Sequence, residues 1–464
     1  MNVRRNALLV AFALILTVPY FAQAQAPIGW RTDGSGVYPT AQPPLEWSTT
    51  KNVVWSTSMP GYGVSHPVLL GKFIYNGSEP GTLLCIDSAD GKIVWERTCK
   101  YSEIEIAPDV RVKLDEELAA IAELNKKESA VRKEMNTLQS SLVKDKVEQK
   151  EINRQLTPFR TQIDEFINEK KTFTLAERYT QPGIHSTAGY SAPTPVTNGR
   201  DIFVAYGNGL VACYDLDGNR KWLKLIEHTD LSFGHSASPI LVGDKLLIQF
   251  TNLVALDTKT GNEVWRLKCQ SSWGTPLATR IGDTDVVVTP KGALVRVADG
   301  KLLAEKLGSC GANSPIMHNG IVYLIHGDSH AVRMPTAIEE TWQPDIVWKA
   351  RVKSSGYGFS SPVLHDGLLY AASDQGIFTV MEADTGKKVY EERLPLEPSI
   401  YPSISLAGQY LYVSSERGTT LVLQPGREYK ILAENKLEPF RSSLVFENKR
   451  VYIRTEKRLY CIGE

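Results

Sequence analysis

The fold of this chain is indicated by Leu84-Cys-Ile-Asp-Ser-Ala-Asp-Gly-Lys-Ile-Val-Trp95, a pattern that recurs over residues 212–222, 255–265 and 380–390. In each copy a short apolar strand leads to an acidic residue, a tight turn contains a glycine, and a second strand ends in an aromatic residue. Strand, turn and strand in this order are typical of a β-hairpin, and glycine suits a turn whose backbone passes through positive φ. The sequence therefore predicts a hairpin at each copy.

A second pair of strands precedes each hairpin and opens with a Ser or Thr near a proline. These prolines are Pro67, Pro195, Pro239, Pro276, Pro315, Pro362 and Pro402. From Pro195 onward they are 44, 37, 39, 47 and 40 residues apart. Four short strands in each unit of this length are the signature of propeller blades.

Weaker copies complete the series. Residues 297–304 and 423–431 lack the final aromatic, and the fifth unit inserts residues 335–344 before Trp348. The last unit ends at the C-terminus one strand short, and the stretch Asn52-Val-Val-Trp55 supplies the missing outer strand. We therefore expect an all-β fold, an eight-bladed β-propeller closed by residues 52–55, with seven blades as the alternative.

The motif A-x-D-x-x-T-G-x-x-x-W at residues 255–265, with its preceding S-x-P strand, resembles the pyrroloquinoline-quinone-like (quinoprotein-type) repeat family. The resemblance runs from about Trp30 to the C-terminus, apart from residues 108–172. It implies a propeller but no single function. Similar repeats serve quinone-dependent dehydrogenases and also non-catalytic scaffolds such as the propeller subunit of the outer-membrane barrel assembly machinery. The opening stretch, residues 29–47, is similar to the start of secreted propeller proteins, and we expect it to form a strap over the torus.

Tryptophans recur once in a blade at one position of the repeat. They are Trp55, Trp95, Trp222, Trp265 and Trp348. An indole could stack on a planar quinone, but a position that repeats around the ring is typical of packing between blades. We interpret these tryptophans as structural.

The N-terminus has the form of an export signal. Arg4 and Arg5 precede an apolar run over residues 7–21, and residues 22–26 offer two overlapping A-x-A cleavage sites. Pro19 interrupts the run, which is shorter than the roughly 20 residues of a membrane span, so a signal peptide over residues 1–26 is favoured over an uncleaved anchor. The mature protein is expected in the periplasm or outside the cell. Lys plus Arg equals Asp plus Glu at 52 each, so no net field favours nucleic acid or anionic lipid.

Residues 108–172 interrupt the repeat with a charged segment that contains no glycine. Its apolar residues alternate at spacings of three and four, which predicts a coiled-coil helical hairpin with its turn within residues 139–146. Pro158 should kink the returning helix or begin a new one capped by Thr157. The hairpin divides the strap and blade 1, residues 27–107, from blades 2–8, residues 173–464. It is either a solvated spacer or an arm for partner binding or self-association.

The six cysteines and eight histidines suggest no catalytic centre. Cys85, Cys213 and Cys461 share one apolar strand position and are expected in the core, whereas a disulfide among Cys99, Cys269 and Cys310 is permitted in an oxidising compartment. There is no C-x-x-C-H haem motif and no adjacent cysteine pair of the kind found over the quinone in dehydrogenases. His326-Gly-Asp-Ser-His330 is read as a turn rather than a metal site, and Gly234-His-Ser-Ala-Ser238 lacks the second glycine of a nucleophile elbow.

The variable residues lie in the loops that enter the first strand of each blade, and such loops gather at one end of the axial funnel. The candidate ligand-binding residues at this funnel mouth are Tyr62, His66, Tyr190, His235, Trp273, Asn313, Tyr357, Tyr401 and Arg441. Aromatic side chains with polar tips around a concave mouth are typical of a ligand or peptide site, although they could also simply cap the channel.

The sequence therefore predicts a non-catalytic binding or scaffolding module of the cell envelope. Its partner would be an envelope protein or a small ligand, with neither nucleic acid nor a membrane span involved, and self-association through residues 108–172 is possible. No metal, catalytic residue or cofactor is predicted. The alternative is a dehydrogenase that depends on pyrroloquinoline quinone with calcium.

Overall fold

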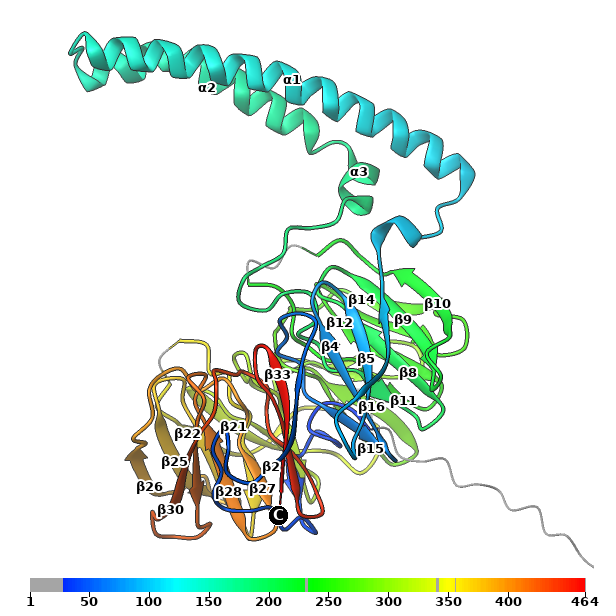
Figure 1. Cartoon of the computed structure of the whole chain (residues 1–464), viewed down its shortest axis with the longest axis vertical. Coiled ribbons are helices and arrows are strands. Elements are labelled where there is room, and N and C mark those ends of the chain that lie inside the picture. Colours follow the sequence, from blue (N-terminus) through cyan, green and yellow to red (C-terminus); the bar gives the residue numbers. More distant parts are fainter. Residues whose placement is uncertain (1–27, 230–232, 339–341, 355, 464) are drawn as a thin grey trace, which may run out of the picture.

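The structure is a computed structural model that describes residues 28–229, 233–338, 342–354 and 356–463. The expected signal peptide, residues 1–26, lies outside the described residues. The described strands form eight separate sheets, and a pair of long helices projects from them (Figure 1). The all-β propeller class that the sequence predicts is confirmed.

The first four sheets each contain four antiparallel strands in chain order. They consist of β3 (Val68–Leu70), β4 (Phe73–Ser78), β5 (Thr82–Asp87) and β6 (Ile93–Thr98); β7 (Val196–Thr197), β8 (Asp201–Ala205), β9 (Leu210–Asp215) and β10 (Arg220–Leu225); β11 (Ile240–Val242), β12 (Lys245–Gln249), β13 (Leu253–Asp257) and β14 (Glu263–Leu267); and β15 (Leu277–Ile281), β16 (Thr284–Val288), β17 (Leu294–Arg296) and β18 (Leu302–Ala304).

The next three sheets repeat this arrangement, and the third of them gains β1 as an extra edge strand. They consist of β19 (Ile316–His318), β20 (Ile321–Leu324), β21 (Asp328–Arg333) and β22 (Asp345–Arg351); β23 (Val363–His365), β24 (Leu368–Ala372), β25 (Ile377–Glu382) and β26 (Lys388–Arg393); and β1 (Val37–Tyr38), β27 (Ser405–Ala407), β28 (Tyr410–Ser414), β29 (Thr419–Leu423) and β30 (Ile431–Lys436).

The eighth sheet joins the two ends of the chain. Its inner strands β31 (Val445–Glu447), β32 (Arg450–Arg454) and β33 (Arg458–Gly463) come from the C-terminus, and its outer strand is β2 (Val53–Ser58). β2 pairs antiparallel with β33, with Trp55 opposite Cys461. This is the pairing that the sequence predicts for residues 52–55.

The sheets are held together by apolar side chains that fill each junction between neighbours. Eight buried clusters each combine residues of two consecutive sheets. One of them joins the eighth sheet to the first through Trp55, Tyr452 and Ile74. Because this junction completes the circle, no sheet is left with an uncovered face at an end of the series.

Each repeat tryptophan lies against the turn of the next sheet. The indole Nε1 of Trp265, for example, donates to the carbonyl oxygen of Val297 at 2.8 Å, and a Cβ built on Gly300 would approach the Trp265 ring to 2.7 Å. Trp55, Trp95, Trp222 and Trp348 make the same bond to Ser88, Leu216, Thr258 and Ala383. Glycine is therefore needed at this turn for two reasons. The backbone has a positive φ, 73° at Gly300, and the indole that covers the turn leaves no room for a Cβ atom.

The N-terminal strap crosses one end of the torus. Ile28 forms a β-bridge with Thr197 of β7, and β1 runs parallel to β27 on the other side of the ring. Between them, Nη2 of the buried Arg31 donates to the carbonyl oxygens of Pro362 (3.1 Å) and Ile404 (2.6 Å). The strap thus connects inner strands that lie far apart in the sequence.

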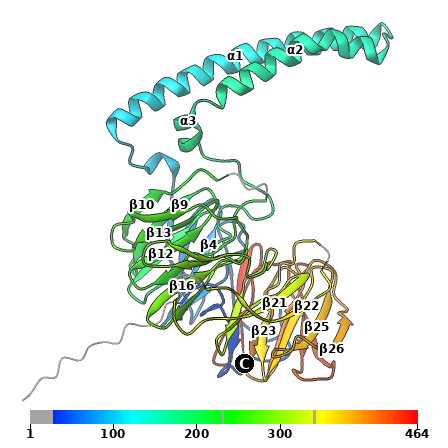
Figure 2. The ribbon, with the colours of Figure 1, turned by 180° about the vertical axis from the view of Figure 1, so that it is seen from behind.

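The inserted segment leaves the sheets as a helical hairpin (Figures 1 and 2). After the short 3-10 helix η1 (Tyr101–Glu103) come α1 (Pro108–Lys144), α2 (Gln149–Lys170) and α3 (Thr174–Tyr179). Leu142, Ile152 and Leu156 form the buried seam near its tip. We call residues 108–172 the arm. No helix among the described residues is long and apolar enough to cross a membrane.

Two details of the arm differ from the prediction. α1 continues to Lys144, so most of the expected turn is helical and the chain reverses over residues 145–148. Pro158 does not begin a new helix capped by Thr157, because α2 runs through it and the Thr157 hydroxyl donates to the carbonyl oxygen of Asn153 (2.8 Å) within the helix. The alternative, a kink at Pro158, stays a prediction. Pro158 is exposed, so water can solvate the carbonyl that loses its amide donor there.

Candidate binding site at the propeller axis

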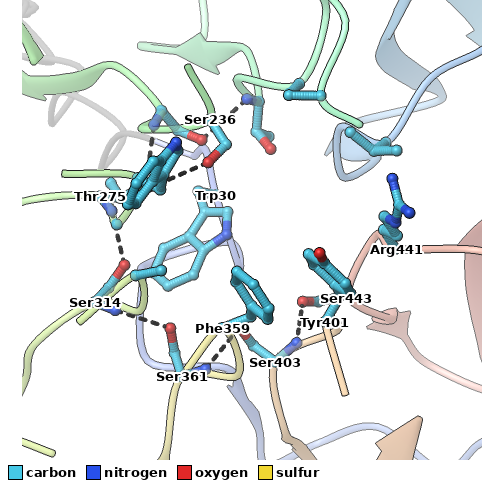
Figure 3. A pocket seen from close by; sticks show the side chains of 18 of the residues that line it. Trp30, Ser236, Thr275, Ser314, Phe359, Ser361, Tyr401, Ser403, Arg441 and Ser443 are labelled. Atoms are coloured by element: carbon cyan, nitrogen blue, oxygen red, sulfur yellow. Dashed lines mark hydrogen bonds between the residues drawn. The ribbon is translucent and has the colours of Figure 1, made fainter. Parts of the chain in front are cut away.

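A closed circle of hydrogen bonds surrounds the axis at the start of the inner strands. One residue from the segment that enters each sheet takes part, and its backbone N–H donates to the side chain of the member that enters the next sheet. The members are His66, Thr194, Ser238, Thr275, Ser314, Ser361, Ser403 and Ser443, at distances of 2.8–3.3 Å. We call this set the floor ring. Figure 3 shows part of it around the indole of Trp30.

His66 replaces the hydroxyl of the other members. Its Nε2 accepts from the N–H of Ser443 at 3.3 Å, so the neutral ring carries its proton on Nδ1. Burial and, to a smaller extent, the positive charge of Arg31 lower the pKa of His66 to about 3. His66 therefore serves as a neutral acceptor near pH 7.

A second ring lies two residues earlier along each strand entry. Its members are Val64, Ala192, Ser236, Trp273, Ala312, Phe359, Tyr401 and Arg441. We call this set the mouth ring. Side chains two positions apart in extended backbone point the same way, so both rings face the axis. All sixteen residues line one cavity of about 240 Å³.

The mouth ring is asymmetric, and its large members continue into an aromatic wall. The ring centroids of Phe233 and Trp273 lie 6.2 Å apart, and those of Trp273 and Tyr357 lie 5.6 Å apart. Tyr357 then stacks on Phe359 at 5.9 Å, and Phe359 on Tyr401 at 4.0 Å. Phe233 and Tyr357 are 43% and 49% exposed, so a bound molecule could contact both of these side chains.

Arg441 ends the aromatic wall with a positive charge. Its guanidinium carbon lies 4.8 Å from the centroid of Tyr401, and its Nε donates to Glu416 at 2.9 Å. Its Nη1 donates to the carbonyl oxygen of Thr187 at 2.8 Å and to the Tyr62 hydroxyl at 3.4 Å. The guanidinium is thus fixed in place at the cavity.

The segment that returns from the arm completes the wall. Thr187 and Ala188 line the cavity, and the ring of His185 meets Phe233 edge-on at 5.4 Å. This follows from the topology. The arm connects β6 to β7, and the floor-ring residue Thr194 lies two residues before β7, so the base of the arm lies at the cavity end of the torus.

The nine predicted mouth residues fall into two groups. His66, Trp273, Tyr357, Tyr401 and Arg441 line the cavity. Tyr62, Tyr190, His235 and Asn313 support its surroundings.

The second group is held by contacts within the protein. The Tyr190 hydroxyl donates to the carbonyl oxygen of Pro182, and His235 meets Phe250 edge-on at 5.2 Å. Asn313 Nδ2 donates to the carbonyl oxygens of Ile325 and Gly358 at 3.0 and 3.1 Å. A polar or aromatic side chain at a loop tip thus often stabilises the loop itself.

Sequence reasoning missed Trp30, Phe233, Phe359 and every floor-ring member except His66 as parts of the site. It aligned Tyr401-Pro402 with Ser361-Pro362, but the floor ring shows that Ser403 is the equivalent of Ser361. The polar residue that precedes the inner strand of each sheet could have identified the floor ring from the sequence. The residue two positions before it is then the member of the mouth ring.

The described residues contain neither a disulfide nor a cluster of metal-binding side chains. All six cysteines are free, so no disulfide links Cys99, Cys269 and Cys310. Cys85, Cys213 and Cys461 are fully buried, as expected of core residues. Within the described ranges no group of three or more His, Cys, Asp or Glu residues could hold a metal ion.

Sequence comparison identifies related proteins. The model of the family described as "Outer membrane protein assembly factor BamB" matches residues 46–124, 178–283 and 251–345, and these matches omit residues 125–177, most of the arm. Outer membrane protein assembly factor BamB of Legionella pneumophila (strain Paris) is 24% identical over 197 residues, which are 39% of this chain and 49% of the relative. The chain therefore spans about half the length of the curated relative that it matches.

Solved structures of similar shape include a BamB and two dehydrogenases. BamB from Moraxella catarrhalis has a TM-score of 0.55 at 13% identity and covers 89% of this chain and 99% of its own. A europium-containing methanol dehydrogenase has a TM-score of 0.55 at 12% identity and covers 94% and 98%. Quinohemoprotein alcohol dehydrogenase from Comamonas testosteroni has a TM-score of 0.52 at 9% identity and covers 94% and 80%. Such identities show a shared fold alone.

Proposed function

Because this chain belongs to the family described as outer membrane protein assembly factor BamB, we propose that it is a non-catalytic binding or scaffolding module of the cell envelope. The observation that carries this proposal is the axial cavity, whose floor and mouth rings each take one residue from the segment that enters each of the eight sheets. A concave site with aromatic walls and few polar groups suits recognition of a ligand or peptide. Because the family is described by a role in outer membrane protein assembly, the assembly system of the outer membrane is the first place to look for the partner.

We interpret the eight sheets as eight blades and the arm as a coiled-coil hairpin. The circle of eight floor-ring hydrogen bonds supports the blade count, because a seven-bladed ring would need only seven members. The seam of Leu142, Ile152 and Leu156 supports the coiled coil. Since the arm starts at the cavity end of the torus, one partner could contact both surfaces.

The quinone-dependent alternative fits the cavity poorly. Pyrroloquinoline quinone carries three carboxylates, and calcium prefers carboxylate and carbonyl oxygen ligands. The described lining residues include no Asp or Glu, and their one permanent cation, Arg441, is already paired with Glu416. The repeat tryptophans lie between sheets, where they are committed to packing.

We further propose that the chain works in the periplasm or outside the cell after removal of residues 1–26. The apolar run and the A-x-A sites of the N-terminus support export.

Capture from envelope extract tests the proposal. Wild-type protein is compared with Trp273→Ala in the mouth ring, with a deletion of residues 108–172, and with Arg427→Gln on the outer surface as a control. A specific partner should be retained by wild type and the control and lost with Trp273→Ala. A partner that all four proteins retain equally would contradict a role for the mouth.

The same preparations test the enzymatic alternative. Purified protein is titrated with pyrroloquinoline quinone and calcium and assayed for dye-linked oxidation of alcohols and sugars. Stoichiometric binding with turnover would overturn the proposal of a non-catalytic module.

A further inference from the structure

The rim of the mouth cavity has one rigid side, the aromatic wall. Its rings contact one another from Phe233 to Tyr401 at centroid distances of 4.0–6.2 Å, so each inner member is held by rings on both sides. The indole of Trp30 fills the centre of the floor ring (Figure 3). A ligand larger than the cavity of about 240 Å³ must therefore enter by displacing another part of the rim.

Residues 183–189 form that other part of the rim, and we call this loop the flap. It contains neither helix nor strand, and Thr187 and Ala188 line the cavity. Within the flap, the N–H of Gly189 donates to the carbonyl oxygen of His185 at 2.8 Å. The N–H of Thr187 donates to Nδ1 of His185 at 3.0 Å. Because these bonds lie inside the loop, the flap can keep its shape while it moves as one unit.

A glycine lies at each end of the flap. Gly183 is exposed, and a Cβ built there would meet no atom within 4 Å. Gly189 has a φ of 66°, in the left-handed region that favours glycine. Hinges are commonly a few loop residues that can absorb a change of φ and ψ. The two glycines therefore suit the hinges of a moving loop.

The chain is anchored just outside both glycines. The Tyr190 hydroxyl donates to the carbonyl oxygen of Pro182, which keeps the two ends of the flap together. The N–H and the hydroxyl of Ser191 both donate to Oε1 of Glu79, at 2.7 and 2.6 Å. A compact loop with adjacent ends is an Ω loop. Rotation at the glycines can thus move the flap without disturbing the sheets.

The strongest contact between the flap and the rest of the rim is made by Arg441. Its charged Nη1 donates to the carbonyl oxygen of Thr187 at 2.8 Å, whereas the Tyr62 hydroxyl reaches the same oxygen at 3.4 Å. The ring of His185 meets Phe233 edge-on at 5.4 Å. Nε of Arg441 is paired with a carboxylate, so the guanidinium stays in place when the flap moves.

We propose that the flap opens the mouth by swinging on Gly183 and Gly189, and that the bond from Arg441 to Thr187 latches it closed. This device regulates the mouth, so it rests on the proposed function. The closed cavity holds only a small group. The open mouth admits the larger segment of a partner, with the aromatic wall as the fixed side of the entrance.

Thiol labelling inside the cavity measures opening without any partner. Ala192→Cys places a thiol in the mouth ring, at a position that is 6% exposed. N-ethylmaleimide should label this thiol slowly, because the reagent reaches it only in the fraction of molecules whose flap is open. Peptide mass spectrometry follows labelling at this position separately from the native cysteines.

Four variants in the Ala192→Cys background test the latch and a hinge. Arg441→Met removes the donor at similar side-chain length and should speed labelling about tenfold, whereas Arg441→Lys keeps a charged donor and should stay near the parent rate. Tyr62→Phe should give a smaller increase, which added space cannot explain because Tyr62 does not line the cavity. Gly183→Ala restricts a hinge and should slow labelling about two- to fivefold. Circular dichroism confirms that each variant is folded.

The outcomes distinguish this inference from the proposed function. Equal labelling rates in the parent, Arg441→Met and Gly183→Ala would overturn the moving flap. Equal acceleration by Arg441→Met and Arg441→Lys would overturn the latch, since only one of them loses the charged donor. The proposed function fails on a separate measurement, partner capture that Trp273→Ala leaves unchanged, which does not depend on labelling rates.

Discussion

Removal of the Ser361 hydroxyl from the floor ring should lower the free energy of unfolding more than removal of the neighbouring Ser360 hydroxyl. In Ser361→Ala, the backbone N–H of Ser314 loses the acceptor that it now reaches at 3.1 Å. Ser361 is 1% exposed, so water cannot readily replace that acceptor. A buried donor left unsatisfied costs about 1–3 kcal/mol. We expect the free energy of unfolding to fall by about that amount.

Ser360→Ala provides the matched control. Ser360 is 3% exposed and its hydroxyl bonds to none of the described residues, so the variant removes the same atom without breaking a bond seen in the structure. Its stability should stay within about 0.5 kcal/mol of wild type or rise slightly, because a buried polar group without a partner is unfavourable. Urea unfolding monitored by circular dichroism measures both variants. If the two variants unfold at the same urea concentration, the floor ring does not hold the blades together as described.

Three further perturbations test other parts of the account. Deletion of residues 108–172 with a short Gly-Ser bridge should leave the propeller folded with nearly unchanged thermal stability, and a loss as large as that of a whole blade would refute an independent arm. The pKa of His66 is 6.5 in the unfolded chain and about 3 when folded, so its contribution to stability is complete above pH 6.5 and is lost as the pH falls toward 3, by at most about 1.4 kcal/mol per pH unit. His66→Gln keeps an acceptor but does not titrate, so its stability should depend less steeply on pH over that range, and an unchanged slope would contradict the assigned pKa. Thiol titration with Ellman's reagent should find six thiols in unreduced, denatured protein and at most one, the half-buried Cys269, in native protein, because burial raises the pKa of these thiols; fewer than six after denaturation would reveal a disulfide.

The repeat made most of the architecture predictable from sequence. The hairpin glycines, the S-x-P strands and the stretch Asn52-Val-Val-Trp55 each reflect a local requirement, namely a turn, a strand start or a missing strand. These requirements can be recognised in a single sequence because the same residues recur in each repeat unit. The contact of Gly300 with Trp265 adds a reason that only the structure provides, since the two residues belong to different sheets.

The site was predictable in part. Trp273, Tyr357, Tyr401 and Arg441 are unusual for their positions in the repeat, and sequence reasoning selected them. Asn313 and Tyr190 are equally unusual but bond to their own surroundings, and no local pattern distinguishes the two cases. Trp30 was assigned only to the strap, because its place in the axis depends on where residues 28–38 cross the ring.

Site-specific photocrosslinking in the envelope tests the central claim most directly. A benzoylphenylalanine at position 357, in the aromatic wall, is compared with one at position 431, which is exposed on the outer strand β30. Our account predicts a discrete crosslinked partner from position 357 that is absent from position 431. The same adducts from both positions, or none from position 357, would contradict the assignment of the axial mouth as the binding surface.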